Sequence, residues 1–191
     1  MKLVAGLGNP GDRYTGTRHN VGFEVADELA RRAGAKFRRS WRFPVFQASS
    51  VQGNETILLV KPRSFMNRSG GALALLMQRK GLAPSDLIVV LDDTELECGR
   101  LRIRPRGGAG GHKGLQSVIE CLGTDEVVRI RIGIGPRPPG HELVEYVLSR
   151  FTPEQREQVG RSIALAADAV ECVVVEGVDR AMNRFNQGAE R

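Results

Sequence analysis

Apolar residues recur along this chain with two different spacings, and each spacing predicts one type of secondary structure. Continuous apolar runs or strict alternation, both typical of strands, occur at residues 2–7, 45–51, 56–61, 87–91, 100–106 and 128–134. Apolar positions three or four residues apart, typical of amphipathic helices, occur at residues 17–32, 71–80, 115–122, 153–175 and 178–185. Because strands and helices alternate along the chain, the pattern predicts an α/β domain.

Local sequence signals define where several of the predicted helices and strands begin or end. Thr17 is a candidate N-cap for the first helix, and Gly81 is placed to end the second. Residues 152–155, Thr-Pro-Glu-Gln, form a helix start with an N-cap, a proline at the first helical position and a capping-box glutamine. Gly53 and Asn54 stand between two predicted strands, which therefore form a hairpin.

Length and composition indicate one ordinary soluble domain. The chain has 191 residues, which suits a single domain over 1–191 that includes the C-terminal helical segment at about 153–186. Its apolar runs are too short to span a membrane, and no signal peptide is evident. Its three cysteines are widely spaced, as in a reduced cytoplasmic protein rather than a zinc or disulfide framework. We expect a monomer, since no long exposed apolar stripe is evident.

Positive charge is concentrated in the first three quarters of the chain. Residues 1–150 hold 23 Lys and Arg against 15 Asp and Glu, whereas residues 151–191 hold 5 against 7. A basic surface attracts phosphate backbones, although solubility alone would also explain a modest excess.

The first twenty residues combine a glycine-rich turn with potential catalytic groups. The turn Gly8-Asn-Pro-Gly11 follows the first strand, and His19 lies at the start of the next helix. Gly6, Gly8 and Gly11 match the spacing of a dinucleotide-binding fingerprint. That motif requires a helix to open at its last glycine, and Pro10 together with the polar residues 12–16 gives no such helix. We therefore predict no nucleotide cofactor.

His19 is the strongest candidate for acid–base chemistry. A helix N-terminus favours its neutral imidazole, and an acidic partner at the end of the apolar run 87–91, either Asp92 or Asp93, would orient the ring. The sequence has no serine elbow, no cysteine near a histidine and no metal-binding motif, so water is the simplest nucleophile. Side-chain amides that could bind a carbonyl or that water are those of Asn9, Asn20 and Asn67. His112 is expected only to shape the glycine loop 107–111, and His141 to lie exposed in a turn.

An ordered set of motifs makes the chain resemble the bacterial peptidyl-tRNA hydrolase family. In order they are Gly6-Leu-Gly-Asn-Pro-Gly11, Tyr14, Thr17-Arg-His-Asn-Val-Gly22, Lys61-Pro62, Phe65-Met-Asn-Arg-Ser-Gly70, Asp92-Asp93, Gly110-Gly-His112 and Arg129-Ile-Arg-Ile-Gly-Ile-Gly135. Each is weak alone, but the set is specific and extends from residue 2 to about residue 185.

The resemblance implies a fold, an activity and a set of site residues. The fold would be one mixed, twisted sheet flanked by helices on both faces. The enzyme would hydrolyse the ester between a stalled peptide and tRNA, without metal or cofactor, and so rescue ribosomes and return tRNA to translation.

The resemblance also assigns a role to each matching position. His19 would activate water, Asp92 would orient His19, and Asn9 would recognise the blocked amino group. Asn67 would bind the carbonyl or the water, and Tyr14 and Phe65 would contact the tRNA end or the peptide. Arg104 and Arg131 would grip the 5′ phosphate of the tRNA.

Two departures from the family pattern leave alternatives open. Lys113 follows Gly-Gly-His where the family usually has asparagine, and it could contact a phosphate or a developing oxyanion. The segment Asp93-Thr-Glu-Leu-Glu-Cys98 also differs, which leaves the choice between Asp92 and Asp93 open. An RNA-binding homologue with weak or no hydrolysis is the alternative function.

Overall fold

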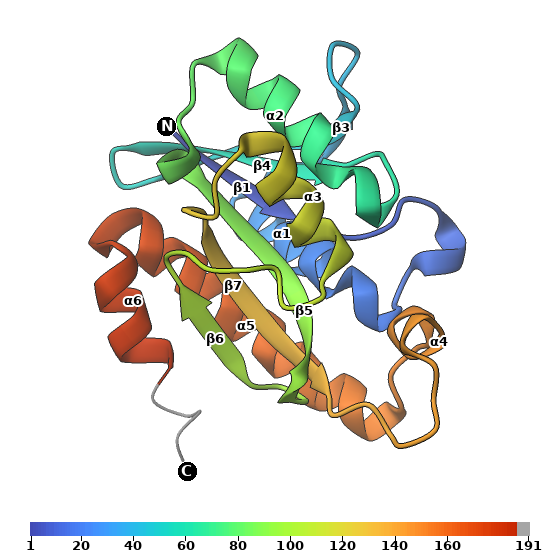
Figure 1. Cartoon of the computed structure of the whole chain (residues 1–191). Coiled ribbons are helices and arrows are strands. Elements are labelled where there is room, and N and C mark those ends of the chain that lie inside the picture. Colours follow the sequence, from blue (N-terminus) through green and yellow to red (C-terminus); the bar gives the residue numbers. More distant parts are fainter. Residues whose placement is uncertain (187–191) are drawn as a thin grey trace.

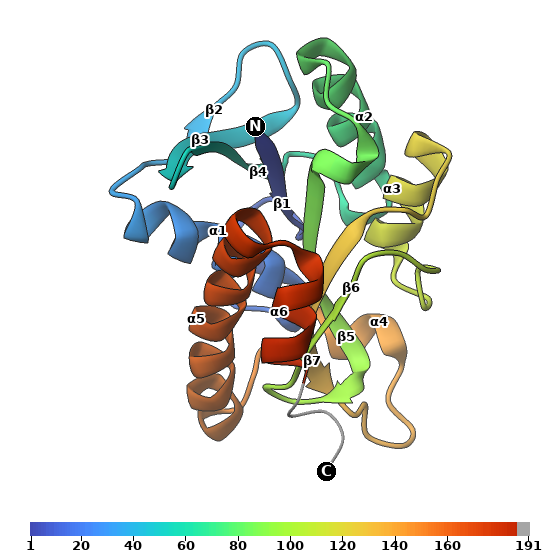
Figure 2. The same cartoon turned by 90° about the vertical axis from the view of Figure 1, so that its left-hand side faces the viewer.

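A seven-stranded mixed sheet lies between two layers of helices in the computed structural model, which describes residues 1–186 (Figures 1 and 2). The strand order is β2-β3-β4-β1-β5-β7-β6. The strands are β1 (Lys2–Gly6), β2 (Arg38–Arg39), β3 (Val45–Gln52), β4 (Glu55–Pro62), β5 (Leu87–Glu97), β6 (Leu101–Arg104) and β7 (Val128–Gly135). The four central strands run parallel, and antiparallel strands close both edges.

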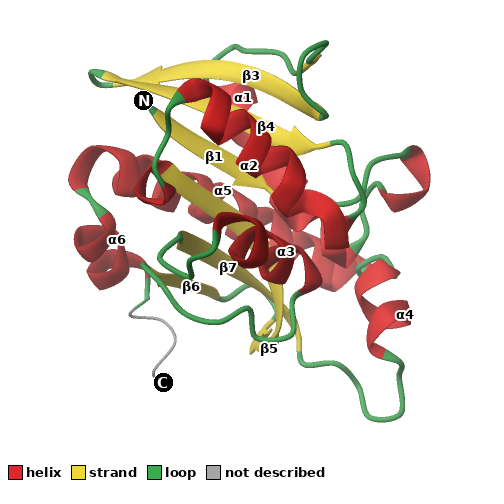
Figure 3. Ribbon diagram, turned by 45° about the horizontal axis from the view of Figure 1, so that its top comes forward, coloured by secondary structure: helices red, strands yellow, loops and turns green. Residues whose placement is uncertain are grey.

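Each face of the sheet is covered by its own group of helices, as Figure 3 shows. The helices are α1 (Val21–Arg32), α2 (Ser69–Lys80), α3 (Lys113–Leu122), α4 (Leu143–Leu148), α5 (Pro153–Glu176) and α6 (Val178–Phe185). One apolar cluster joins α1, α5 and α6 to one face, and a second joins α2 and α3 to the other. Alternate residues of β1 divide between the clusters, Val4 in the first and Leu3 and Ala5 in the second, as a buried strand requires.

The order in which successive strands are added to the sheet reverses at β1. From β1 the chain continues through α1 to the β3–β4 side of the sheet, and it then crosses by α2 to β5 on the other side of β1. In open α/β sheets, ligands bind at the carboxyl ends of the strands beside such a reversal. The ends of β1 and β5 are therefore the expected place for a site.

Most of the predicted elements are confirmed, including the α/β class, helices on both faces and the hairpin. Thr152 caps α5 with the expected reciprocal hydrogen bonds to Gln155, and Gly81 ends α2 in the left-handed conformation. The spacing of apolar residues does not predict the two-residue strand β2 or the short helix α4. Each is too brief to show a period.

Two predicted boundaries are wrong. The first helix begins at Val21, because residues 18–20 form a separate 3-10 turn that carries His19. The strand predicted at 87–91 continues to Glu97, so Asp92 and Asp93 lie within β5 rather than after it. Among residues 1–186, no helix is long and apolar enough to cross a membrane.

Candidate active site

A pocket of about 400 Å³ lies at the carboxyl ends of β1 and β5. It brings together residues that are far apart in the sequence, from the loop after β1, the 3-10 turn before α1, β5, the glycine loop and α4. Of the predicted site residues, the pocket is lined by Asn9, Tyr14, His19, Phe65, Asn67, Asp92, Lys113 and Arg131. Arg104 is the predicted residue that lies outside it.

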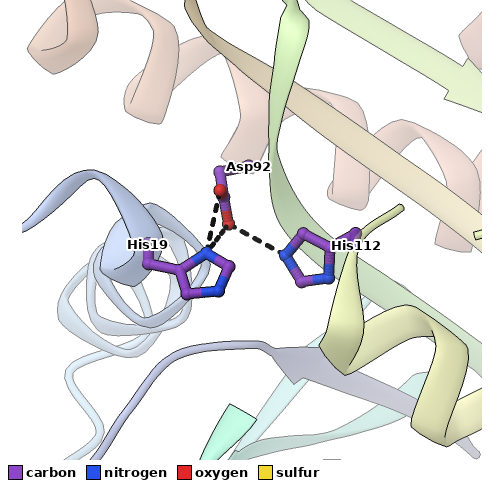
Figure 4. A group of neighbouring side chains, drawn as sticks. All are labelled: His19, Asp92 and His112. Carbon is purple, nitrogen blue, oxygen red and sulfur yellow. Dashed lines mark hydrogen bonds and ion pairs between the residues drawn. The ribbon is translucent and has the colours of Figure 1, made fainter. Parts of the chain in front are cut away.

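Asp92 lies between two imidazole rings at the base of this pocket (Figure 4). His19 Nδ1 is 2.8 and 2.9 Å from the two carboxylate oxygens of Asp92, and His112 Nε2 is 3.0 Å from Oδ1. The Asp92 side chain is 2% exposed. Of the two aspartates proposed as the partner of His19, Asp92 is therefore the one in contact with it.

The hydrogen bonds define where the protons lie. His112 Nδ1 accepts from the backbone N–H groups of Gly114 and Leu115, so its proton is on Nε2 and is donated to Asp92. Burial raises the pKa of Asp92, but the facing rings of His112 and His19 lower it more, and the net pKa is well below its usual range. An ionised Asp92 accepts a hydrogen bond from the Nδ1–H group of His19, which leaves the lone pair of the neutral imidazole on Nε2.

The His19 turn is held to the C-terminal part of the domain by its neighbour Arg18. Arg18 donates to Ser149 Oγ at 2.6 Å and to Gln155 Oε1 at 2.7 Å, and its guanidinium lies over the rings of Tyr146 and Phe151. These contacts join the turn that carries His19 to both ends of the α4–α5 connection. The imidazole is thus placed by contacts more than 100 residues away in sequence.

Asn9 is fixed by a reciprocal pair of hydrogen bonds with Asn20. The backbone N–H of Asn9 donates to Asn20 Oδ1 at 2.8 Å, and Asn20 Nδ2 donates to the carbonyl oxygen of Asn9 at 3.0 Å. Asn9 Oδ1 accepts from the backbone N–H of Met66, so the NH₂ group of Asn9 is the part of the amide left for a ligand. Asn20 uses its amide oxygen and nitrogen to hold Asn9 and does not line the pocket, so it supports Asn9 instead of facing a ligand there.

Asp93 has a different partner from Asp92. Its carboxylate pairs with Arg131 Nη1 at 3.0 Å, and Arg131 Nη2 donates to the carbonyls of Gly108 and Ala109 in the glycine loop. Arg131 therefore ties the loop to β5 at the edge of the pocket. Neighbouring residues of a strand face opposite sides of the sheet, which explains why Asp92 and Asp93 meet different groups.

A second arginine of β7, Arg129, is buried and holds the same loop. It donates to the backbone carbonyls of Val127, Asp125 and Gly107, and burial is the main cause that lowers its pKa to about 10. Arg104 lies opposite Arg129 in the β6–β7 ladder but is exposed. Within residues 1–186, the Arg104 guanidinium pairs with no carboxylate, so it is available to an anion.

The remainder of the pocket is largely apolar. Tyr14 and Phe65 meet edge to face at 6.4 Å between ring centroids, and Phe65 is half exposed. Across the pocket, α4 contributes Leu143, Val144, Val147 and Leu148. Asn67 and Lys113 are exposed at the opening. An apolar wall beside polar groups suits a ligand with an uncharged, chain-like part.

The group His19, Asp92 and His112 also has the composition of a metal site, since one donor atom from each lies within 4.8 Å of the others. The hydrogen bonds described above already occupy these atoms. Both ring nitrogens that face Asp92 carry protons, which a metal would have to displace. The arrangement fits a charge-stabilised histidine better than a preformed metal centre.

Comparison with known proteins identifies the family to which the chain belongs. The family described as peptidyl-tRNA hydrolase matches residues 3–191. The chain belongs to this family. A peptidyl-tRNA hydrolase of Chloroflexus aggregans is 46% identical over 187 residues, covering 97% of this chain and 99% of that protein. One of Halalkalibacterium halodurans is 41% identical over 186 residues, covering 97% and 100%.

A solved structure shows the same fold. The crystal structure of peptidyl-tRNA hydrolase from Acinetobacter baumannii superposes with a TM-score of 0.92 at 29% identity, covering 97% of this chain and 94% of that one. The resemblance of the motifs to the peptidyl-tRNA hydrolase family, and the mixed sheet expected from it, are both confirmed.

One member of the candidate site could not be predicted from the sequence alone. His112 was expected only to shape the glycine loop, yet it caps α3 and donates to Asp92. A histidine directly after Gly110-Gly111 and before a helix was the available signal. What the sequence could not show was that α3 begins beside the carboxyl end of β5.

Proposed function

We propose that this protein hydrolyses the ester bond between the peptide and the tRNA of peptidyl-tRNA, with His19 as the general base. The observation that carries the mechanism is the contact of His19 Nδ1 with the ionised Asp92. It leaves a lone pair on Nε2 of a residue that lines the pocket. The alternative of a homologue that only binds RNA has no comparable support.

In the proposed reaction His19 Nε2 removes a proton from water as the water oxygen attacks the ester carbonyl. Asp92 stabilises the imidazolium that forms, while His112 fixes the position of Asp92. When the tetrahedral intermediate collapses, the carbon–oxygen bond to the ribose breaks and His19 returns the proton to the ribose oxygen. The products are a peptide with a free carboxylate and tRNA with a free terminal hydroxyl.

The same proposal gives each surrounding polar group a role in binding or catalysis. The NH₂ group of Asn9 donates to the peptide carbonyl that a blocked amino group carries, which free aminoacyl-tRNA lacks. Asn67 and Lys113 stand at the opening of the pocket, where an amide or ammonium group can donate to the developing oxyanion. Lys113 would supply a charge where the family usually has a neutral amide.

The rest of the substrate would contact the outer parts of the site. Tyr14, Phe65 and the α4 side chains would hold the peptide or the tRNA end, and Arg104 and Arg131 would contact the 5′ phosphate region. We infer a monomer that acts in the cytoplasm, where its substrate arises, and that needs neither metal nor cofactor.

The decisive test is release of N-acetyl-aminoacyl groups from tRNA by the purified protein, with unblocked aminoacyl-tRNA alongside and EDTA present. We expect cleavage of the blocked substrate only, and a loss of roughly 10²–10⁴-fold in kcat for His19→Ala with tRNA affinity unchanged. Near-normal turnover by His19→Ala would refute the assignment of the base. Tight tRNA binding without any cleavage would favour the RNA-binding alternative, with Lys113→Asn as the next variant.

A further inference from the structure

A basic and aromatic turn lies outside the pocket, between β2 and β3. We call residues 39–44, together with Arg63 beside them, the Trp41 turn. These residues line a shallow hollow of their own. Trp41 is 90% exposed and is the single tryptophan of the chain. A large aromatic side chain held in solvent loses apolar contact that a partner could restore.

Hydrogen bonds and packing hold the residues on either side of Trp41 in place. Ser40 is buried, its N–H donates to Val45 O at 3.0 Å, and its hydroxyl accepts from the backbone N–H of Phe43 at 3.2 Å. Phe43 packs against the apolar cluster under α2 and α3. Residues on both sides of Trp41 are thus anchored, which holds the backbone at Trp41 at the surface with its indole in solvent.

The charge around Trp41 is of one sign. Residues 33–54 contain four Lys and Arg and no Asp or Glu. Within the described part of the chain, the guanidinium groups of Arg39, Arg42 and Arg63 form no ion pair, whereas Arg31 and Arg32 on α1 both pair with Glu28. Arg42 lies 5.4 Å from the centre of the Trp41 ring. Arg39 and Arg42 are exposed and Arg63 is half-buried. Arginines that no carboxylate neutralises attract anionic partners.

The Trp41 turn lies at the same end of the parallel strands as the pocket, where their carboxyl ends are. Val45 pairs with Pro62 at the carboxyl end of β4, and the N–H of Arg63 donates to Pro44 O at 2.8 Å. Two residues beyond Arg63 the chain reaches Phe65, which lines the pocket. A long ligand bound in the pocket can therefore extend toward the turn.

We propose that the Trp41 turn is a second RNA-binding surface, which holds an unpaired nucleotide of the substrate's tRNA. The base stacks on the Trp41 indole, and the adjoining phosphates contact Arg39, Arg42 and Arg63. An aromatic platform among arginines is the combination by which proteins bind single-stranded nucleic acid. The identity of the RNA as tRNA rests on the proposed function, whereas the chemistry of the surface does not.

The single tryptophan makes this surface directly observable. Titrating the protein with deacylated tRNA should quench its tryptophan fluorescence in a saturable manner, because a stacked base quenches indole. Excitation at a wavelength where tyrosine does not absorb restricts the signal to Trp41. The His19→Ala variant should be quenched equally, since it retains the turn. Heparin, a polyanion without bases, should quench little. Unchanged fluorescence at tRNA concentrations that saturate binding, measured independently by filter binding, would overturn the proposal.

Kinetics provide the second test. Trp41→Ala should raise KM for N-acetyl-aminoacyl-tRNA by about fivefold or more with kcat unchanged, and Trp41→Phe should restore most of the loss. N-acetyl-aminoacyl-adenosine, which carries one nucleotide, should be cleaved equally well by all three proteins. Leu165→Ala, which shortens an exposed apolar side chain on α5, is the matched control and should leave KM unchanged.

The two tests separate the inference from the proposed function. Quenching by tRNA in a protein that hydrolyses nothing would support the RNA surface and refute the enzyme. Normal hydrolysis with wild-type KM in Trp41→Ala would refute the RNA surface and leave the enzyme in place. A surface that binds the peptide portion instead would show the KM effect without quenching by deacylated tRNA, which also refutes the proposal.

Discussion

At the scale of single residues, the site depends on a buried carboxylate that remains ionised. Burial opposes the charge of Asp92, but His112 and His19 both donate to it, and their effect prevails. In the proposed reaction this charge stabilises the positive imidazole that forms when His19 takes a proton. His112 uses its second nitrogen to cap α3, so it connects Asp92 to a fixed element.

Replacing Asp92 by asparagine should show how much of the activity depends on the charge of the side chain and how much on its shape. Asp92→Asn keeps the size of the side chain but removes the charge, and we expect kcat to fall by roughly 10²–10⁴-fold, as for loss of general base catalysis. The measurement is release of N-acetyl-aminoacyl groups from tRNA. Asp93→Asn is the matched control, since Asp93 pairs with Arg131 and not with a histidine. Equal losses in the two variants would contradict the role given to Asp92.

The same residue predicts a pH dependence of stability. The folded pKa of Asp92 is below its value of about 3.9 in an unfolded chain, so its stabilising effect is complete above about pH 4 and is lost as the pH falls toward the folded pKa. The free energy of unfolding of wild type minus that of Asp92→Asn should therefore decrease below pH 4. Urea titrations from pH 6 to pH 3 measure it, and a constant difference would refute the prediction.

At the scale of elements, close backbone approaches position the helices around the site. α2 and α3 meet where a Cβ added to Gly70 would stand 2.0 Å from the carbonyl oxygen of Ser117. The N–H of Gly70 also donates to Ser117 Oγ at 3.1 Å. Since α3 begins at the residue after His112, this contact helps to place the imidazole beside Asp92.

Two adjacent glycines of α2 allow a matched experiment. Gly70→Ala should lower the free energy of unfolding by about 1–3 kcal/mol, because the added methyl forces α2 and α3 apart. Gly71→Ala should raise it by about 0.5–1 kcal/mol, since open space surrounds that position and alanine favours a helix. Urea unfolding of the two variants tests the sign of each effect. Destabilisation of similar size by both would show that the contact with Ser117 is not the cause.

β5 also departs from regular geometry next to the site. Its register with β7 shifts between Asp93 and Glu97, where the partner strand advances only from Gly133 to Gly135. A Cβ on either glycine would collide with the backbone of β5, so these glycines make room for the bulge. A bulge beside a catalytic residue redirects the strand that follows. Here it follows directly after Asp92 and Asp93.

At the scale of the whole molecule, the basic residues divide into those that hold the structure and those left for a ligand. Arg129 binds backbone carbonyls of the glycine loop, and Arg18 binds the α4–α5 connection. Arg104 on one half of the sheet, and Arg39 and Arg42 of the Trp41 turn on the other, are exposed, with the pocket between them. A large anionic substrate could contact both halves while its reactive end occupies the pocket.

The salt dependence of tRNA binding tests this division. Arg104→Ala should weaken tRNA binding and reduce the slope of log K against log salt by about 1, as expected when one phosphate contact is lost. Cleavage of N-acetyl-aminoacyl-adenosine should be unaffected. Arg79→Ala, at the end of α2, removes an equally exposed charge and should leave the slope unchanged. Equal slopes for Arg104→Ala and the wild type would exclude a phosphate contact at Arg104.

The sequence by itself determined most of the elements, the family and the candidate base. Periods of two and 3.6 are local properties of a chain, so β1, the hairpin and α5 could be predicted from neighbouring residues. His19 could be singled out because it stands in an ordered series of motifs. The sequence also narrowed its acidic partner to two adjacent residues, Asp92 and Asp93.

Only the tertiary structure decided which groups meet. Asp92 and Asp93 point to opposite faces of β5, and the packing of α1 on one face determines which of them His19 contacts. The roles of His112 and Asn20 depend likewise on elements joined only by folding. Local patterns carry no information on such pairings, because the free energy that forms them comes from burial of whole surfaces against one another.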